Sequence, residues 1–141
     1  AASSARLRSS ARSVTLMRKY LRLVLLLAAA ALMMFAAVTT TTVSVPHLRE
    51  DLLEINVRPT LLGAVMMGLH FGSFAMFGFA ALVLVLAIRT LQAAGTDRLL
   101  IAIIAAVYLL FGIAGFIGTG SHHILGYALM GLLLGGSLLI K

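Results

Sequence analysis

Residues 61–88 have the sequence LLGAVMMGLHFGSFAMFGFAALVLVLAI, a run of 28 residues without Asp, Glu, Lys or Arg. The one ionisable side chain in this run is His70. About 20 apolar residues in a helix cross the ~30 Å hydrocarbon core of a bilayer, so the run is long enough for a transmembrane helix. Three further charge-free runs cover residues 23–46, 99–121 and 124–140. We therefore expect an all-α integral membrane protein with four transmembrane helices.

The composition leaves no room for a separate soluble domain. Of 141 residues, 62% are hydrophobic and only 11% are charged, against about 25% charged residues in soluble domains. The absence of cysteine excludes disulfides and iron–sulfur ligation. We expect spans at about 20–45, 59–92, 98–118 and 121–140. Because their connectors are short, consecutive spans should be neighbours in an up-down antiparallel bundle.

The connector between the first two spans has a pattern of its own. Pro46 is expected to end the first span, because proline lacks the amide that continues a helix. Apolar residues then recur at helical spacing among charged residues in 47–58. This pattern predicts a short amphipathic helix on the membrane surface. Further on, Gly95-Thr96-Asp97 predicts a turn in which Thr96 or Asp97 can cap the third span.

The basic residues are distributed asymmetrically. Nine lie in the segments before span 1, between spans 2 and 3, and after span 4: Arg6, Arg8, Arg12, Arg18, Lys19, Arg22, Arg89, Arg98 and Lys141. Only Arg49 and Arg58 lie on the opposite side, so both termini are predicted to be cytoplasmic or on the matrix side. We expect a bacterial inner membrane, with the mitochondrial inner membrane as the alternative.

Six of these basic residues precede the first span, and residues 1–19 contain no acidic residue. We expect 1–19 to be a basic Ser/Arg-rich tail and 20–141 to be the four-helix transmembrane domain. A targeting segment is the alternative origin of this tail. A basic cluster beside a span favours anionic lipid headgroups or a partner over nucleic acid. The residues expected to make these contacts are Arg6, Arg8, Arg12, Arg18, Lys19 and Arg22.

Glycines occur at the spacing that allows close helix packing. Gly68 and Gly72 form a GxxxG pair in the second span, and Gly131 and Gly135 form another in the fourth. The third span contributes Gly112 and Gly115. Membrane helices associate through such small residues, since lipid tails are as apolar as leucine. We expect these glycines to pack within the bundle, or else against another subunit.

His70 is the main candidate for a cofactor site, because ionisable residues inside spans are rare. Its helix face includes Met66, Phe74 and Phe77. An imidazole in such surroundings suits a haem iron, a quinone carbonyl or a pigment. The sequence requires none of them. The alternative is a neutral buried histidine that bonds to Ser73 or to a backbone carbonyl. Haem ligation by two histidines is disfavoured, because no second histidine is expected at the same depth.

The remaining histidines, His47, His122 and His123, are expected on the outer surface. His47 and Asp51 are four residues apart on the predicted surface helix. Imidazole and carboxylate together suit zinc or copper. Adjacent residues of a helix point about 100° apart, so His122 and His123 would rarely bind one ion. A weak metal site is one interpretation, and solvated histidines at headgroup level are the other.

Three functions follow from these features. The first is a non-catalytic accessory subunit of a larger membrane complex, for example an energy-transducing one, with membrane lipids and other subunits as partners. The second is an electron-transfer subunit that binds haem, quinone or pigment at His70. The third is a small transporter, which is disfavoured because no span contains Asp, Glu, Lys or Arg. No catalytic residue is predicted, and the substrate and the identity of the complex stay open.

Overall fold

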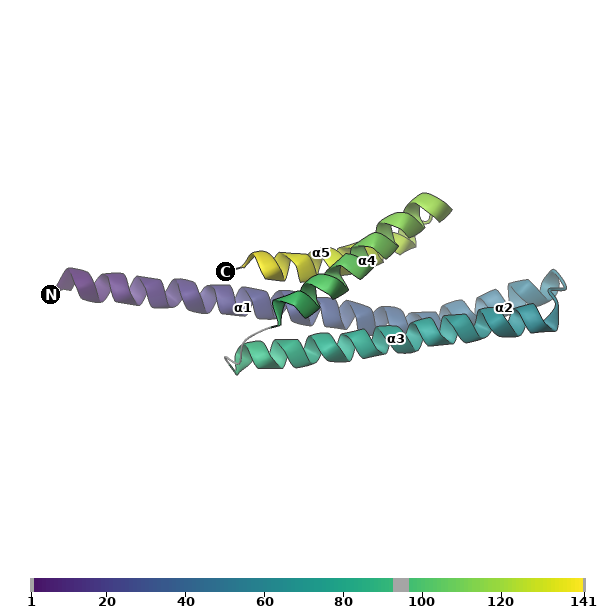
Figure 1. The fold of residues 1–141 in the computed structure, drawn as a ribbon, viewed down its shortest axis with the longest axis horizontal. Helices are drawn as coiled ribbons and strands as arrows, with labels where there is room; N and C mark the ends of the chain where they lie inside the picture. The colour runs from purple at the N-terminus through teal and green to yellow at the C-terminus, as the bar shows by residue number, and fades with distance from the viewer. Residues whose placement is uncertain (1, 93–96, 141) are drawn as a thin grey trace. The chain divides into compact units, whose positions relative to one another are not determined.

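The computed structural model describes the backbone of residues 2–92 and 97–140 and the side chains of 13–92 and 97–140. The described chain is helical and contains no strand. Its main helices are α1 (Ala2–Thr39), α2 (Val45–Glu54), α3 (Pro59–Leu91), α4 (Arg98–Thr119) and α5 (Leu125–Leu139), drawn in Figure 1. A π-helical segment, η1 (Thr40–Ser44), joins α1 to α2, and a 3₁₀ turn, η2 (His122–Ile124), precedes α5.

Four helical stretches are long and apolar enough to cross a membrane: Ser13–Glu54, Pro59–Leu91, Arg98–Thr119 and His122–Leu139. The prediction of four spans is therefore confirmed at the level of length and composition. The last three begin and end within one residue of the expected positions. At 1.5 Å per residue, the 33 residues of α3 extend about 50 Å, well beyond the ~30 Å apolar core of a bilayer.

The expected end of the first span at Pro46 is wrong. The helix widens into η1, where the Val45 amide donates to the Thr40 carbonyl, and it then continues as α2 to Glu54. A wide π turn relieves the clash between a proline ring and the preceding turn. The hydroxyls of Thr41 and Thr42 donate to the carbonyls of residues four positions earlier, a type of bond that often accompanies a bend in a helix.

The segment predicted to be a separate surface helix is helical as α2 up to Glu54, but it continues the first long helix rather than standing apart from it. A turn at residues 55–58 leads from α2 to α3, and Asn56 adopts a positive φ of 54° there. Asparagine tolerates this left-handed conformation better than most residues. The segment expected as a basic tail is also helical from Ala2 onward and continuous with α1.

The chain forms two compact units. One comprises Ala30–Leu82, and the other comprises Ala1–Ala29 with Val83–Lys141. In the first unit the fully buried apolar side chains are those of Met33, Ala37 and Ala80. In the second, Leu26, Val83, Ile101, Ile104 and Leu134 are fully buried. Alanine and methionine side chains therefore form the first core, and branched aliphatic side chains form the second.

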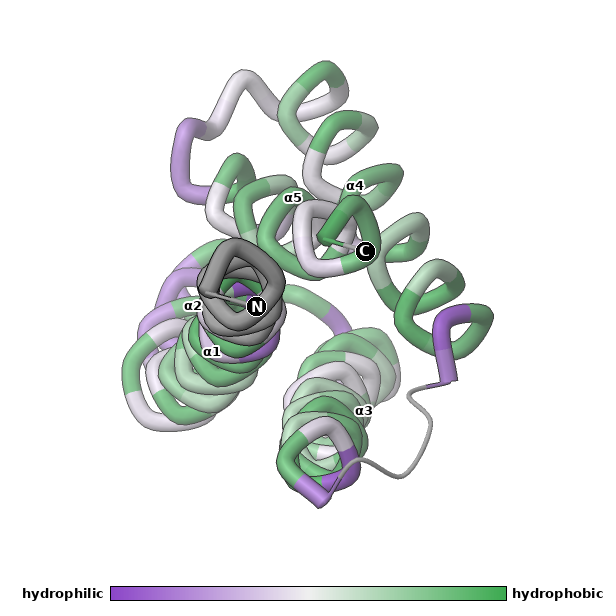
Figure 2. The backbone as a smooth tube through the Cα atoms, turned by 90° about the vertical axis from the view of Figure 1, so that its left-hand side faces the viewer, coloured by the Kyte–Doolittle hydropathy of each residue, from purple (hydrophilic) through white to green (hydrophobic). Residues whose placement is uncertain are grey.

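Within the second unit, α4 and α5 lie side by side (Figures 1 and 2). An added Cβ at Gly112 would lie 2.8 Å from the Ala128 Cα, and one at Gly131 would lie 2.7 Å from the Leu109 amide nitrogen. Residue numbers rise along α4 as they fall along α5, so this helix pair runs in opposite directions. The glycines let the two backbones approach closely, as small residues do in membrane helix pairs.

Aromatic rings extend this α4–α5 interface. The ring of Tyr127 meets that of Phe111 edge-on at 5.1 Å between centroids, and it lies 6.3 Å from that of Tyr108. At the start of α4, Asp97 accepts a hydrogen bond from the Leu100 amide at 3.2 Å. This confirms Asp97 as the cap of the third span, while Gly95 and Thr96 lie outside the described residues.

Candidate functional site

His70 lies on an exposed part of α3. Of the residues expected around it, Met66 and Phe77 are half-buried, and Phe74 is 72% exposed. Ser73, proposed as a hydrogen-bond partner, instead donates its hydroxyl to the Leu69 carbonyl at 3.1 Å. The imidazole makes no hydrogen bond with any residue that the structure describes. His70 is thus placed where only something outside the described chain could bind it.

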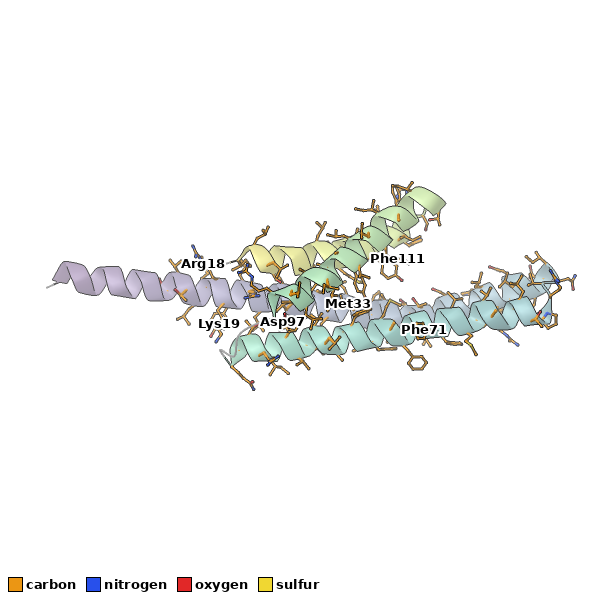
Figure 3. The ribbon with its side chains drawn as sticks, in the orientation of Figure 1. Arg18, Lys19, Met33, Phe71, Asp97 and Phe111 are labelled. Carbon is orange, nitrogen blue, oxygen red and sulfur yellow. The ribbon has the colours of Figure 1, made fainter. Side chains whose placement is uncertain are left out.

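One face of α3 carries bulky side chains that no part of the described chain covers. Met67 is 76% exposed, and Phe71 is 75% exposed and projects away from its helix in Figure 3. An added Cβ at Gly68 or Gly72 would meet no described atom within 4 Å. Within the described chain, the two glycines of this GxxxG pair therefore face open space, whereas Gly112 and Gly131 lie against the backbone of the neighbouring helix.

The other predicted packing glycines divide in the same way. An added Cβ at Gly115 would lie 2.7 Å from the Ile124 Cγ2, so this position is filled by the neighbouring segment. Gly135, the partner of Gly131 in its GxxxG pair, faces open space within the described chain. Within the described chain, both glycines of the α4 pair, one glycine of the α5 pair and neither glycine of the α3 pair lie against a neighbouring segment.

The outer histidines lie on two different elements. His47 and Asp51 are exposed on α2, and His122 and His123 form most of η2. The His122 ring lies 5.6 Å from that of Phe116, at an angle of 33° between the planes. Among the described residues, no three His, Cys, Asp or Glu side chains gather into a group that could hold a metal ion.

Basic side chains gather where helices of the second unit begin and end. The ammonium group of Lys19 on α1 donates to the Leu91 carbonyl at the end of α3, at 2.8 Å. The Arg98 guanidinium at the start of α4 donates to the Leu138 carbonyl near the end of α5. Both cations bond to carbonyls that a helix leaves unpaired at its C-terminus. Arg18 and Lys19 are labelled on α1 in Figure 3.

Arg22 lies one turn beyond Arg18 and Lys19 on α1. Unlike Lys19 and Arg98, it donates no hydrogen bond from its Nε and Nη2 atoms to a helix-end carbonyl of the described chain. Its Nε and Nη2 atoms are buried without a hydrogen-bond partner among the described residues. It is also close enough to Arg98 to be repelled by that charge. From the sequence, Arg22 is expected in the basic cluster and Arg98 bears only on the orientation, because nothing in the spacing predicts that these two residues are close. The side chains of Arg6, Arg8 and Arg12 lie outside the described residues.

Seven serine and threonine hydroxyl groups inside the helices bond to backbone carbonyls of their own helices. The hydroxyl of Thr90 donates to the Leu86 carbonyl at 2.9 Å, and that of Ser137 donates to the Leu134 carbonyl at 2.7 Å. The same pattern holds for Thr39, Thr41, Thr42, Ser73 and Thr119. Such bonds satisfy the hydroxyl locally, as serine and threonine commonly do in membrane helices.

Four apolar helices of membrane-spanning length, with charges largely confined to their ends, define the class of the molecule as an integral membrane protein. No protein-family model matches the chain, and no curated protein or solved structure shows significant similarity to it.

Proposed function

We propose that this protein is a non-catalytic subunit of a larger membrane complex, in which its helices contact the helices of other subunits. The polar side chains offered by its spans support this proposal. The hydroxyls of Ser73, Thr90 and Ser137 bond to the backbone of their own helices, and the spans contain no acidic residue between 61 and 88 or between 99 and 140. Transport and catalysis require polar groups that are available for a substrate.

The open face of α3 is the observation that carries the proposal. Gly68 and Gly72 leave a shallow strip on the helix, and Met67 and Phe71 stand beside it with more than 70% of their surface exposed. Small residues let a second backbone approach closely and gain van der Waals contact and interhelical hydrogen bonds, whereas lipid tails make no such use of them. A helix of a partner subunit fits this face better than lipid alone.

The test is to replace Gly72 by leucine and isolate the protein in mild detergent from its native membrane. An added Cβ at Gly72 meets no described atom within 4 Å, so the melting temperature of the isolated protein should stay unchanged. The amount of co-purifying subunits, measured by native mass spectrometry, should fall. Gly118→Leu is the matched control, because Gly118 also faces open space but lies on α4. Wild-type protein that purifies alone at native expression level contradicts the proposal.

The basic N-terminal segment offers a second test of complex membership. Residues 2–19 form the first half of α1 and extend it beyond the apolar part of the span. Deletion of residues 1–19 should weaken the association with partner subunits if this segment reaches them. The deletion also removes Lys19 and its bond to the Leu91 carbonyl, so Lys19→Gln is the control for that single loss.

In the membrane, we propose an up-down antiparallel arrangement of the four spans with both termini on the cytoplasmic or matrix side. Nine basic residues lie in the segments on that side and two on the other. This asymmetry suits a bacterial inner membrane, or the mitochondrial inner membrane as the alternative.

His70 supports a second candidate, an electron-transfer subunit that binds haem, quinone or pigment. The observation that favours it is an exposed imidazole without a hydrogen bond to any described residue, flanked by Met66 and Phe74. A visible absorbance band in the natively isolated protein that disappears in His70→Ala supports this candidate. A spectrum without such a band in the intact complex contradicts it for haem and pigment, and extraction of quinone from both forms tests the remaining ligand.

A further inference from the structure

The π-helical segment η1 leaves a backbone carbonyl without an amide. In an α-helix the Thr41 carbonyl would accept from the Val45 amide, but that amide donates to Thr40 instead. In the π-helical pattern its partner would be residue 46, which is a proline and has no amide. The Thr41 carbonyl therefore lies inside a continuous helical stretch and pairs in neither pattern. In apolar surroundings such a carbonyl needs a donor from outside the helix.

Two hydroxyl groups of the same segment make no hydrogen bond within the described chain. A helical serine commonly donates to the carbonyl three or four positions earlier, which for Ser44 means Thr41 or Thr40. Ser44 is exposed, and its hydroxyl makes no such bond. The Thr40 hydroxyl is also unbonded there, whereas those of Thr39 and Thr41 bond to earlier carbonyls. One wide turn thus offers three oxygens that can accept hydrogen bonds.

The charges next to this turn favour a cation as the donor. The helix α2 follows η1 directly and exposes the carboxylates of Glu50, Asp51 and Glu54 against one guanidinium, that of Arg49. Unpaired carbonyls of a helix also carry partial negative charge. The chain itself shows such a bond elsewhere, since the ammonium group of Lys19 donates to a carbonyl at the end of α3 at 2.8 Å.

The depth of η1 in the first span decides which cation can reach it. The charge-free run begins at Leu23, and Thr41 follows 18 positions later, which is about 27 Å at 1.5 Å per residue. The hydrocarbon core of a bilayer is ~30 Å thick. The turn therefore lies at the edge of the core, at the level of the phospholipid headgroups.

We propose that η1 binds the primary ammonium group of a phosphatidylethanolamine headgroup through the Thr41 carbonyl and the hydroxyls of Thr40 and Ser44. A primary ammonium has three N–H donors and no acceptor, which matches three accepting oxygens. The choline headgroup carries the same positive charge without an N–H donor, so it cannot make these bonds. The site depends on insertion of the chain into a bilayer and not on membership of a complex.

The experiment uses vesicles with equal amounts of phosphatidylethanolamine, its monomethyl and dimethyl derivatives, and phosphatidylcholine. The lipids that the purified full-length protein retains from them are measured by native mass spectrometry. Retention should fall in that order, because each methyl group replaces one N–H donor. Pro46→Ala should lower the preference for phosphatidylethanolamine over phosphatidylcholine about tenfold, because the restored amide lets the helix pair its own carbonyl and one charge-assisted hydrogen bond is lost. Ser44→Ala should lower it by a similar factor.

Pro59→Ala is the matched control for the proline substitution. Pro59 is the first residue of α3, where an amide has no partner within the helix. This variant should leave the lipid preference unchanged. An equal effect of Pro59→Ala and Pro46→Ala would overturn the inference.

Three other outcomes also decide the matter. Equal retention of all four lipids by the wild-type protein overturns the site and leaves the Thr41 carbonyl to water. A preference for phosphatidylethanolamine that neither Pro46→Ala nor Ser44→Ala reduces places the lipid elsewhere on the protein. If Pro46→Ala melts below the wild type, Ser44→Ala decides, since it leaves the backbone pattern intact, and an unchanged preference in that variant overturns the inference.

Discussion

Gly131→Ala should destabilise the protein, and the matched substitution Gly68→Ala should not. An added Cβ at Gly131 would lie 2.6 Å from the Leu109 Cγ, 2.7 Å from the Leu109 amide nitrogen and 2.8 Å from the Ala105 carbonyl oxygen. Two of these three atoms belong to the backbone of α4, which cannot rotate away as a side chain can. At Gly68 the same Cβ meets no described atom within 4 Å.

The size of the effect follows from these distances. Ordinary contact begins at 3.4 Å, so α4 and α5 must separate locally by about 0.7 Å to admit the methyl group. Overpacking of this kind costs about 1–3 kcal/mol. Replacing glycine by alanine in a helix also stabilises by about 1 kcal/mol, and this gain is common to both variants. The two variants should therefore differ in free energy of unfolding by about 1–3 kcal/mol, with Gly131→Ala the less stable.

Thermal unfolding of both variants in the same detergent, followed by circular dichroism, measures this difference. For a chain of this size, 1 kcal/mol corresponds to a shift of roughly 3–5 °C in melting temperature. Gly131→Ala should melt below Gly68→Ala by that amount or more. If Gly131→Ala melts at the same temperature as Gly68→Ala or above it, the close α4–α5 contact does not exist as described.

Three further predictions test other parts of the molecule. In intact cells or oriented vesicles, Asn56→Cys should react with an impermeant thiol reagent from outside and Thr96→Cys should not; the opposite pattern would reverse the proposed topology. Pro46→Ala should raise the melting temperature, because it restores an amide within a continuous helix; the free energy of unfolding should increase by up to about 1 kcal/mol. A lower melting temperature would show that the π-helical segment stabilises the fold. His70→Ala should change the free energy of unfolding of the isolated protein by less than about 0.5 kcal/mol, since the side chain is exposed; a large loss in the same melt would place it in the core.

The helices of this protein follow from local composition. The charge-free runs at 61–88, 99–121 and 124–140 predict α3, α4 and the η2–α5 segment to within a few residues, because the length of an apolar run sets the length of the span. The cap at Asp97 follows from the preference of helix starts for a short acidic side chain. The prediction that the first span ends at Pro46 was wrong, because the π-helical turn before the proline lets the helix continue through it.

The contacts between helices could not be predicted from the sequence. Gly68 and Gly131 each begin a GxxxG pair in an apolar helix, so nothing local distinguishes them, yet only Gly131 lies against a neighbouring backbone. Arg22 and Arg98 are likewise two ordinary residues at the ends of spans until α1 and α4 bring them within reach of each other. The sequence by itself determined the apolar helices and the segments in which positive charge gathers, because both depend on each segment's own composition. The tertiary structure decided which glycines pack and which buried guanidinium nitrogens lack a hydrogen-bond partner among the described residues, because these depend on the relative position of residues far apart in the chain.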